Sequence, residues 1–122
     1  MTTKKDQAIK KILKDFESFS ELTLNQLSAL EKILSSDDTT LCEETINQMK
    51  KNETKLDDFE VSISERIVKT IVLHKPVASD LRKIFACYRM SVNLERIGDL
   101  VMNVIKFMDK VKEHDTFRMP NG

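Results

Sequence analysis

Acidic residues recur at helical spacing in two parts of the chain. Glu95 and Asp99 lie four residues apart in the stretch VNLERIGDL, and Glu53 and Asp57 have the same spacing, with Glu60 three residues further on. Residues three or four apart share one face of an α-helix, where like charges cost roughly 0.2–0.5 kcal/mol per pair. A multivalent cation would remove this repulsion. Oxygen ligands favour Mg²⁺, Ca²⁺ or Mn²⁺, and also iron when several carboxylates converge.

A second interpretation of the same pattern is an acidic helix face in contact with solvent. Basic residues that could neutralise the carboxylates occur nearby in the sequence, at Lys55, Arg66, Lys69 and Arg96. Such a face serves solubility and needs no ligand. Spacing alone therefore leaves a metal site and a solvated surface both open.

Three long helices would have to position these carboxylates. The chain of 122 residues contains only two Gly and two Pro, and two segments interrupt its helical pattern: SSDDTT at 35–40 and HKP at 74–76. Thr40 and Glu43 have the spacing of a capping box, and Pro76 suits the first turn of a helix. We therefore expect helices over about 4–35, 39–73 and 76–113. Because their connections are short, they should form a single all-α domain (1–122), an antiparallel up-down-up three-helix bundle.

Apolar residues at steps of three and four support this arrangement and predict the buried faces. The first helix carries Ile9, Ile12, Leu13, Phe16, Phe19, Leu27, Leu30 and Leu34. The second carries Ile46, Met49, Leu56, Phe59, Ile63, Ile67 and Thr70. The third carries Cys87, Met90, Leu94, Ile97, Val101, Ile105 and Met108, with Gly98 at the edge of this face, where a neighbouring helix could approach closely.

The third helix has a further apolar side, which continues the ridge of Glu95 and Asp99 toward its N-terminus. Its members are Leu81, Ile84, Phe85, Tyr88 and Val92. An apolar surface of this size needs a cover, so we expect it to contact a partner, a second copy of the chain being the first candidate.

The overall composition excludes several classes of protein. Twenty basic residues balance twenty acidic ones, which argues against nucleic-acid binding. The five lysines among the first fourteen residues alternate with apolar residues, as on a solvated helix face. No apolar run approaches the ~20 residues of a membrane span. Cys42 and Cys87 lack metal-type spacing and are expected to be reduced thiols, so the expected location is the cytoplasm.

Two segments closely resemble the PhoU family of phosphate-uptake regulators: KPVASDLRKI at 75–84 and NLERIGDLVMNV at 93–104. The resemblance implies a three-helix bundle whose acidic motifs hold metal, iron included. The matching positions are Glu53, Asp57, Glu60, Glu95 and Asp99. Ser64 stands where the family often has Asp, which removes one ligand. Family members usually carry two bundles in tandem, whereas this chain has the length of one.

The resemblance also implies a regulatory, non-enzymatic function in phosphate homeostasis. The protein would bind a phosphate transporter or its sensor kinase at the cytosolic face, with no direct membrane contact, and would form a homodimer. The residues expected to contact partners are Leu81, Ile84, Phe85, Tyr88, Arg82 and Arg96. The alternatives are a soluble domain of a sodium–phosphate cotransporter and a purely structural dimerisation bundle. A ferritin-like di-iron enzyme is disfavoured because the chain has no Glu-x-x-His motif.

Overall fold

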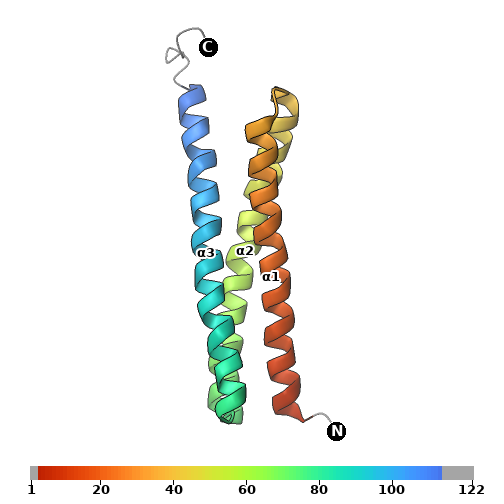
Figure 1. Ribbon diagram of the computed structural model, residues 1–122, viewed down its shortest axis with the longest axis vertical. Helices are drawn as coiled ribbons and strands as arrows, with labels where there is room; N and C mark the ends of the chain where they lie inside the picture. Colours follow the sequence, from red (N-terminus) through yellow and green to blue (C-terminus); the bar gives the residue numbers. More distant parts are fainter. Residues whose placement is uncertain (1–2, 114–122) are drawn as a thin grey trace.

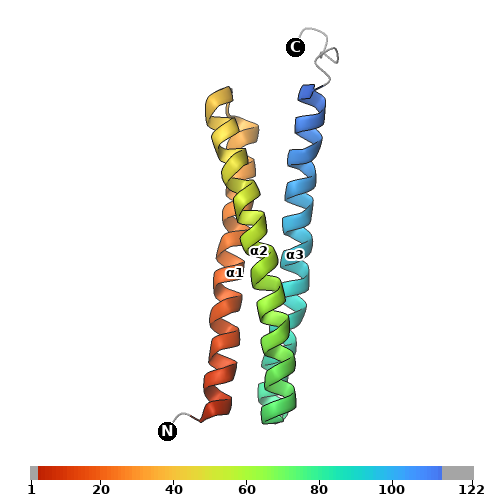
Figure 2. The ribbon, with the colours of Figure 1, turned by 180° about the vertical axis from the view of Figure 1, so that it is seen from behind.

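Three antiparallel helices make up the part of the chain that the computed structural model describes, residues 3–113. Helix α1 spans Lys4–Ser35, α2 spans Thr39–His74 and α3 spans Ala78–Glu113. Each helix packs against the other two. The N-terminus of α1, the C-terminus of α2 and the N-terminus of α3 lie at one end of the molecule (Figures 1 and 2). The predicted all-α, up-down-up bundle is confirmed.

Short polar side chains cap the first two helices. The Thr3 hydroxyl accepts a hydrogen bond from the Asp6 amide (3.1 Å), and the Asp6 carboxylate accepts one from the Thr3 amide (3.4 Å). Helix α2 begins after Asp38, whose carboxylate accepts from the Leu41 amide (3.1 Å). The predicted capping box starting at Thr40 is therefore wrong, because Asp38 already satisfies the free amide one turn into the helix.

The second connection is one residue longer than the sequence suggested and runs over 75–77. Helix α2 ends at His74, and Lys75 adopts a left-handed conformation (φ 41°) while its amide donates to the Ile71 carbonyl (3.2 Å). The α conformation is disfavoured for a residue that precedes proline, so Lys75 is a natural end point. Pro76 then lies before α3, which begins at Ala78 and not at 76 as expected.

Two clusters of apolar side chains form the core. The cluster nearer the α2–α3 connection contains Ile9, Ile12, Phe19, Leu56, Ile63, Ile67, Ile84 and Cys87. The other contains Ile33, Met49, Val101, Met102 and Ile105. Every residue predicted to face the core from the second helix is buried or half-buried.

The buried face of α1 departs from the prediction at three leucines and two polar residues. Leu13 and Leu27 are exposed, and Leu34 is 65% exposed. Thr23 and Gln26 are fully buried instead. The spacing from Phe16 onward explains this, since 16, 19, 23, 26, 30 and 33 continue one stripe at steps of three and four. Leu34, Leu27 and Leu13 lie about 50°, 70° and 110° from the centre of that stripe, at or beyond its edge.

Gln26 is satisfied by a network that joins all three helices. Its side-chain amide donates to the Met49 carbonyl of α2 (3.0 Å) and lies 3.7 Å from the Met102 sulfur of α3. Its oxygen accepts from the Asn52 amide (3.1 Å). A buried amide without such partners would be costly. The network fixes the register of α1 against α2 at Asn52, the residue before Glu53.

The apolar sides of α3 are also arranged differently from the expectation. Met90, predicted to face the core, is exposed, and Ser91 is buried in its place. Ile84, predicted to lie on a partner surface, is 1% exposed and belongs to the core. The reason is that α3 turns positions 84, 87, 91 and 94 toward the other helices, which moves the buried face by one residue.

Helix α3 diverges from the other two helices at the end away from the α2–α3 connection (Figure 1). A cleft of about 440 Å³ lies there, and its lining includes Ile33, Ile46 and Met108. The Lys50 ammonium and the Asp109 carboxylate, 3.4 Å apart, form a salt bridge between α2 and α3 at this cleft. None of the described helices is both long and apolar enough to cross a membrane. Cys42 and Cys87 are free cysteines.

Candidate metal centre

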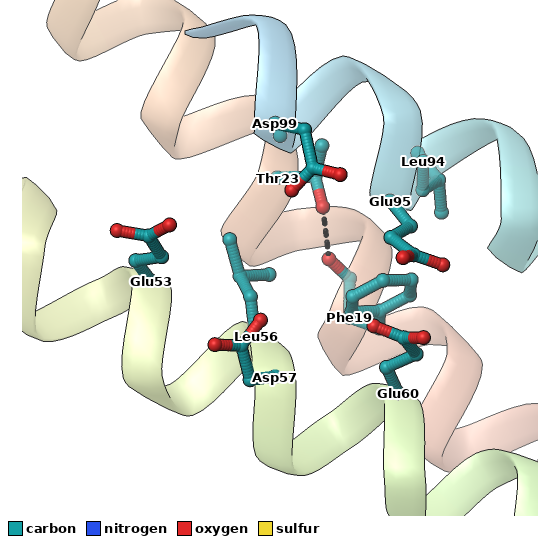
Figure 3. Close-up of a pocket in the computed structure, with 10 residues that line it drawn as sticks. Phe19, Thr23, Glu53, Leu56, Asp57, Glu60, Leu94, Glu95 and Asp99 are labelled. Atoms are coloured by element: carbon teal, nitrogen blue, oxygen red, sulfur yellow. Dashed lines mark hydrogen bonds between the residues drawn. The ribbon is translucent and has the colours of Figure 1, made fainter. Parts of the chain in front are cut away.

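The two acidic ridges meet in a groove near the middle of the bundle. Helices α2 and α3 run antiparallel, so their carboxylates enter the groove from opposite sides (Figure 3). All five residues that the sequence proposes as metal ligands line it: Glu53, Asp57, Glu60, Glu95 and Asp99. Ser64 is half-buried and is not among the lining residues.

Apolar side chains form the floor of this groove. Phe19 and Thr23 come from α1, Leu56 from α2 and Leu94 from α3. The Thr23 hydroxyl donates to the Phe19 carbonyl (2.9 Å), which leaves it no free proton for the groove. The cavity volume is about 20 Å³, enough for roughly one water or one ion. No Lys or Arg is among the ten lining residues, so within the groove the carboxylates are not neutralised by basic side chains.

Crowding of the carboxylates has a measurable consequence at Glu60. Partial burial raises the pKa of Glu60 from 4.5 to about 7, assisted by a hydrogen bond with Glu95 and by repulsion from Glu95, Asp57 and Asp99. A hydrogen bond between two carboxyl groups requires one proton. At neutral pH, Glu60 is therefore protonated for a substantial fraction of the time and can donate this proton to the Glu95 carboxylate.

The carboxylates are gathered but do not converge on a single point. Glu60 and Glu95 reach toward each other across the groove, whereas Glu53 lies further along α2 (Figure 3). Within the described part of the chain, no three Asp, Glu, His or Cys side chains are placed so that together they could hold a metal ion. The donor set fits a hard, oxygen-preferring cation, but binding requires these side chains to change conformation.

Gly98 lies on the α3 side of the groove, and its role differs from the prediction. A Cβ atom at this position would lie 3.8 Å from the Leu56 side chain, which is an ordinary contact distance. The close approach of α2 and α3 therefore does not require glycine here. The prediction that Gly98 allows a closer approach is wrong.

The residues predicted to contact partners do not form one exposed surface. Phe85 and Tyr88 are exposed on α3, as are Arg82 and Arg96, while Leu81 is half-buried. Ile84 is in the core and is removed from this set. Exposed apolar residues continue beyond Val92 at similar spacing toward the C-terminal end of α3, and the sequence analysis did not select them: Leu100, Val104, Phe107 and Val111.

Thr23, Gln26 and Asn52 are the polar residues near the groove that sequence reasoning missed. Thr23 lines the groove, and Gln26 and Asn52 hydrogen-bond beside it. The available signal was positional, since Thr23 and Gln26 occupy two steps of the apolar stripe of α1. A polar residue at a core position predicts a hydrogen-bonded network there.

Comparison with known proteins agrees with this structure. The PhoU domain family model matches residues 16–108, which include all of the groove. A phosphate-specific transport system accessory protein PhoU homolog 1 from Methanothermobacter thermautotrophicus is 31% identical over 92% of this chain and 49% of its own length. Homologs from Rhizobium meliloti and Aquifex aeolicus are 32% and 30% identical over 83% and 77% of this chain.

The chain spans about half the length, or less, of these curated relatives. It covers 49% of the Methanothermobacter protein, 41% of the Rhizobium protein and 44% of the Aquifex protein. No solved structure matches the chain significantly. The relatives therefore identify the kind of domain, and the bundle described above is a unit that they contain within a longer chain.

Proposed function

The chain belongs to the PhoU family, and from this premise we propose that it regulates phosphate transport through contacts with other proteins, without enzymatic activity of its own. The relatives are named as accessory proteins of a phosphate-specific transport system. The corresponding partners here are a phosphate transporter or its sensor kinase, bound in the cytoplasm. The groove of carboxylates has a volume of about 20 Å³, which is too small for an organic substrate at these side chains.

We propose further that the groove binds a divalent or trivalent cation, with iron, Mg²⁺, Mn²⁺ and Ca²⁺ as candidates. The observation that carries this proposal is the gathering of five carboxylates with no basic side chain among the groove's lining residues. Glu60 and Glu95, from two different helices, would be the central ligands, and Asp57, Asp99 and Glu53 would complete the set. A cation bound there would join α2 to α3 and set the spacing of the surface that a partner contacts.

Metal binding can be tested by elemental analysis combined with thermal unfolding. The protein is purified without chelator, and its Tm is then measured with and without added Mn²⁺ or Fe²⁺. Because an ion that binds only the folded state raises stability by mass action, we expect Tm to rise with metal concentration. The combined change Glu95→Gln with Asp99→Asn should abolish this rise.

The chain offers a matched control on α1. Glu17 and Glu21 are exposed and also lie four residues apart, but they face away from the groove. The combined change Glu17→Gln with Glu21→Gln should leave the metal-induced rise in Tm intact. Equal metal content and equal Tm shifts in both double variants would remove the proposed site.

The exposed apolar face of α3 is the surface we propose for homodimerisation. Phe85, Tyr88 and Val92 begin this face, and Leu100 and Phe107 continue it opposite the core. Burying such side chains contributes roughly 1.5–3 kcal/mol each. Sedimentation should show a dimer at micromolar concentration that the change Phe107→Ser weakens, whereas Leu24→Ser, on exposed α1 surface, should not. A monomer at all concentrations would contradict the proposal.

Two other functions are compatible with the same bundle, and the metal experiment separates the second of them from the proposal. A soluble domain of a sodium–phosphate cotransporter would carry the same groove. In that case the bundle would be one part of a longer chain that also contains the transporter. A purely structural dimerisation bundle would dimerise but would show no change in Tm with any metal.

A further inference from the structure

The net charge of the chain is zero, but basic and acidic residues are concentrated in different parts of the bundle. We define the basic end as the first three turns of α1 (4–14), the last three of α2 (64–74), the connection 75–77 and the first three turns of α3 (78–88). It contains ten basic and three acidic residues, a net charge of +7. The rest of the chain has ten basic and seventeen acidic residues, a net charge of −7.

Only the tertiary structure brings these charges together. The charges come from two distant parts of the sequence, 4–14 and 64–88, and both lie at the same end of the molecule (Figures 1 and 2). Most of these charges remain available. In the described part of the chain, Lys5 pairs with Asp80, while Lys11 and Arg66 share Asp15. The other basic residues of this end form no described salt bridge and are exposed: Lys4, Lys10, Lys14, Lys69, Lys75, Arg82 and Lys83.

The tip of the basic end is also apolar. Val72, Leu73 and Val77 flank the α2–α3 connection and are 64%, 68% and 60% exposed. They lie beside Lys69 and Lys75, and the left-handed Lys75 turns the chain sharply between them. A rigid tip with exposed branched aliphatic side chains surrounded by lysines is the arrangement expected of a protein surface that enters the headgroup region of an anionic bilayer.

We propose that the basic end of the bundle docks directly on a membrane surface rich in anionic phospholipid. The lysines and arginines would contact the headgroups, and Leu73 and Val77 would enter the interface. This departs from the sequence-based expectation of a purely indirect membrane contact, and it does not depend on the metal site or on any protein partner.

A lipid surface fits these observations better than an acidic protein. The basic residues are spread over all three helices around the end of the bundle and do not line one groove, as a single peptide would require. A planar anionic surface contacts all of them at once. Three exposed apolar residues of this end, Val72, Leu73 and Val77, flank the α2–α3 connection, where a bilayer would take them up.

Vesicle sedimentation tests the proposal with the intact chain. We expect binding to vesicles of phosphatidylglycerol mixed with phosphatidylcholine, and little binding to phosphatidylcholine alone. Salt should weaken this binding, since the screening length falls from about 10 Å at 0.1 M to about 3 Å at 1 M. Equal binding to both kinds of vesicle, or binding to neither, would overturn the proposal, and the second outcome would leave an acidic protein as the partner of this end.

Charge removal at either end of the bundle provides a matched comparison. Each lysine near an anionic surface strengthens binding by about five-fold. The triple change K69Q, K75Q and K83Q should therefore weaken vesicle binding by about 100-fold. The triple change K51Q, K106Q and K110Q removes three exposed lysines from the acidic remainder and should have no such effect. Equal losses in both variants would show that only net charge matters and would refute docking by one end.

Insertion of the tip can be followed by fluorescence, because the chain contains no Trp. The change Leu73→Trp places a reporter at the tip, and Leu34→Trp places one at a similarly exposed position at the opposite end. Anionic vesicles should shift the emission of Leu73→Trp to shorter wavelength and leave that of Leu34→Trp unchanged. Unchanged emission from Leu73→Trp while the protein sediments with the vesicles would refute the insertion of the tip.

Discussion

Replacing Glu60 with Gln tests whether the crowded carboxylates cost stability. Glu60 is the residue of the groove whose pKa is raised to about 7 by burial, by its hydrogen bond with Glu95 and by three neighbouring carboxylates. Glutamine keeps the shape of the side chain but cannot ionise. It therefore removes the penalty for placing a charge at this position while leaving the packing against α3 in place.

The magnitude follows from the difference between the folded and unfolded states. A pKa of 4.5 in the unfolded chain and about 7 in the folded one corresponds to at most about 3.4 kcal/mol. Glu60 is partly exposed, so solvent screening reduces this to about 1–2 kcal/mol. The folded state binds more protons between these two values. Stability is therefore lost as pH rises from about 4.5 through about 7, and it levels off above that range.

Urea unfolding at about pH 5 and about pH 8 measures this effect. We expect Glu60→Gln to gain about 1–2 kcal/mol relative to the wild type on going from the lower to the higher pH. Glu65→Gln, an exposed position on the same helix outside the groove, is the control and should follow the wild type. If Glu60→Gln shows the same pH dependence as the wild type, neither burial nor the neighbouring carboxylates raise the pKa of Glu60 in the folded protein, and the reasoning fails.

Three further predictions concern the scaffold around the groove. Gly98→Ala should stabilise the protein by about 0.5–1 kcal/mol in urea unfolding, because the added Cβ fits 3.8 Å from Leu56 and the helix loses its glycine; destabilisation would show that the helices do need the gap. Gln26→Leu should cost about 1–3 kcal/mol in the same assay, because it leaves the Met49 carbonyl without its side-chain donor, and a neutral result would mean that water replaces the amide. Asp38→Ala should lower Tm through loss of about 1 kcal/mol of capping, whereas Thr40→Ala, already inside α2, should change it little.

The sequence by itself determined the number of helices, their type and their antiparallel order. Long segments without Gly or Pro, separated by the two breaks at 35–40 and 74–76, predict three helices, and the short connections make neighbouring helices antiparallel. It also determined which carboxylates share a face, because the positions of Glu53, Asp57, Glu95 and Asp99 along a helix are fixed by its period of 3.6 residues. All of these residues do line one groove.

The sequence was less informative wherever a polar residue replaced an apolar one on a buried face. Leu27 and Leu34 were predicted to be buried because they are apolar. Thr23 and Gln26 occupy the core instead, because hydrogen bonds within and between helices satisfy their polar groups. A single helix contains no information about those partners. The predictions for Met90 and Ile84 were wrong for the same reason. Met90 is exposed and Ile84 is in the core, because the rotation of α3 about its axis is set by the helices that it packs against.

Only the tertiary structure decided which charges face which. It placed Glu60 against Glu95, more than thirty residues apart, and so raised the pKa of Glu60. It also gathered basic residues from two separate stretches, 4–14 and 64–88, at one end of a chain whose total charge is zero. The physical reason is the same in both cases: a helical period fixes directions within one helix, whereas the energy of a charge depends on distances between helices, which exist only after they have packed together.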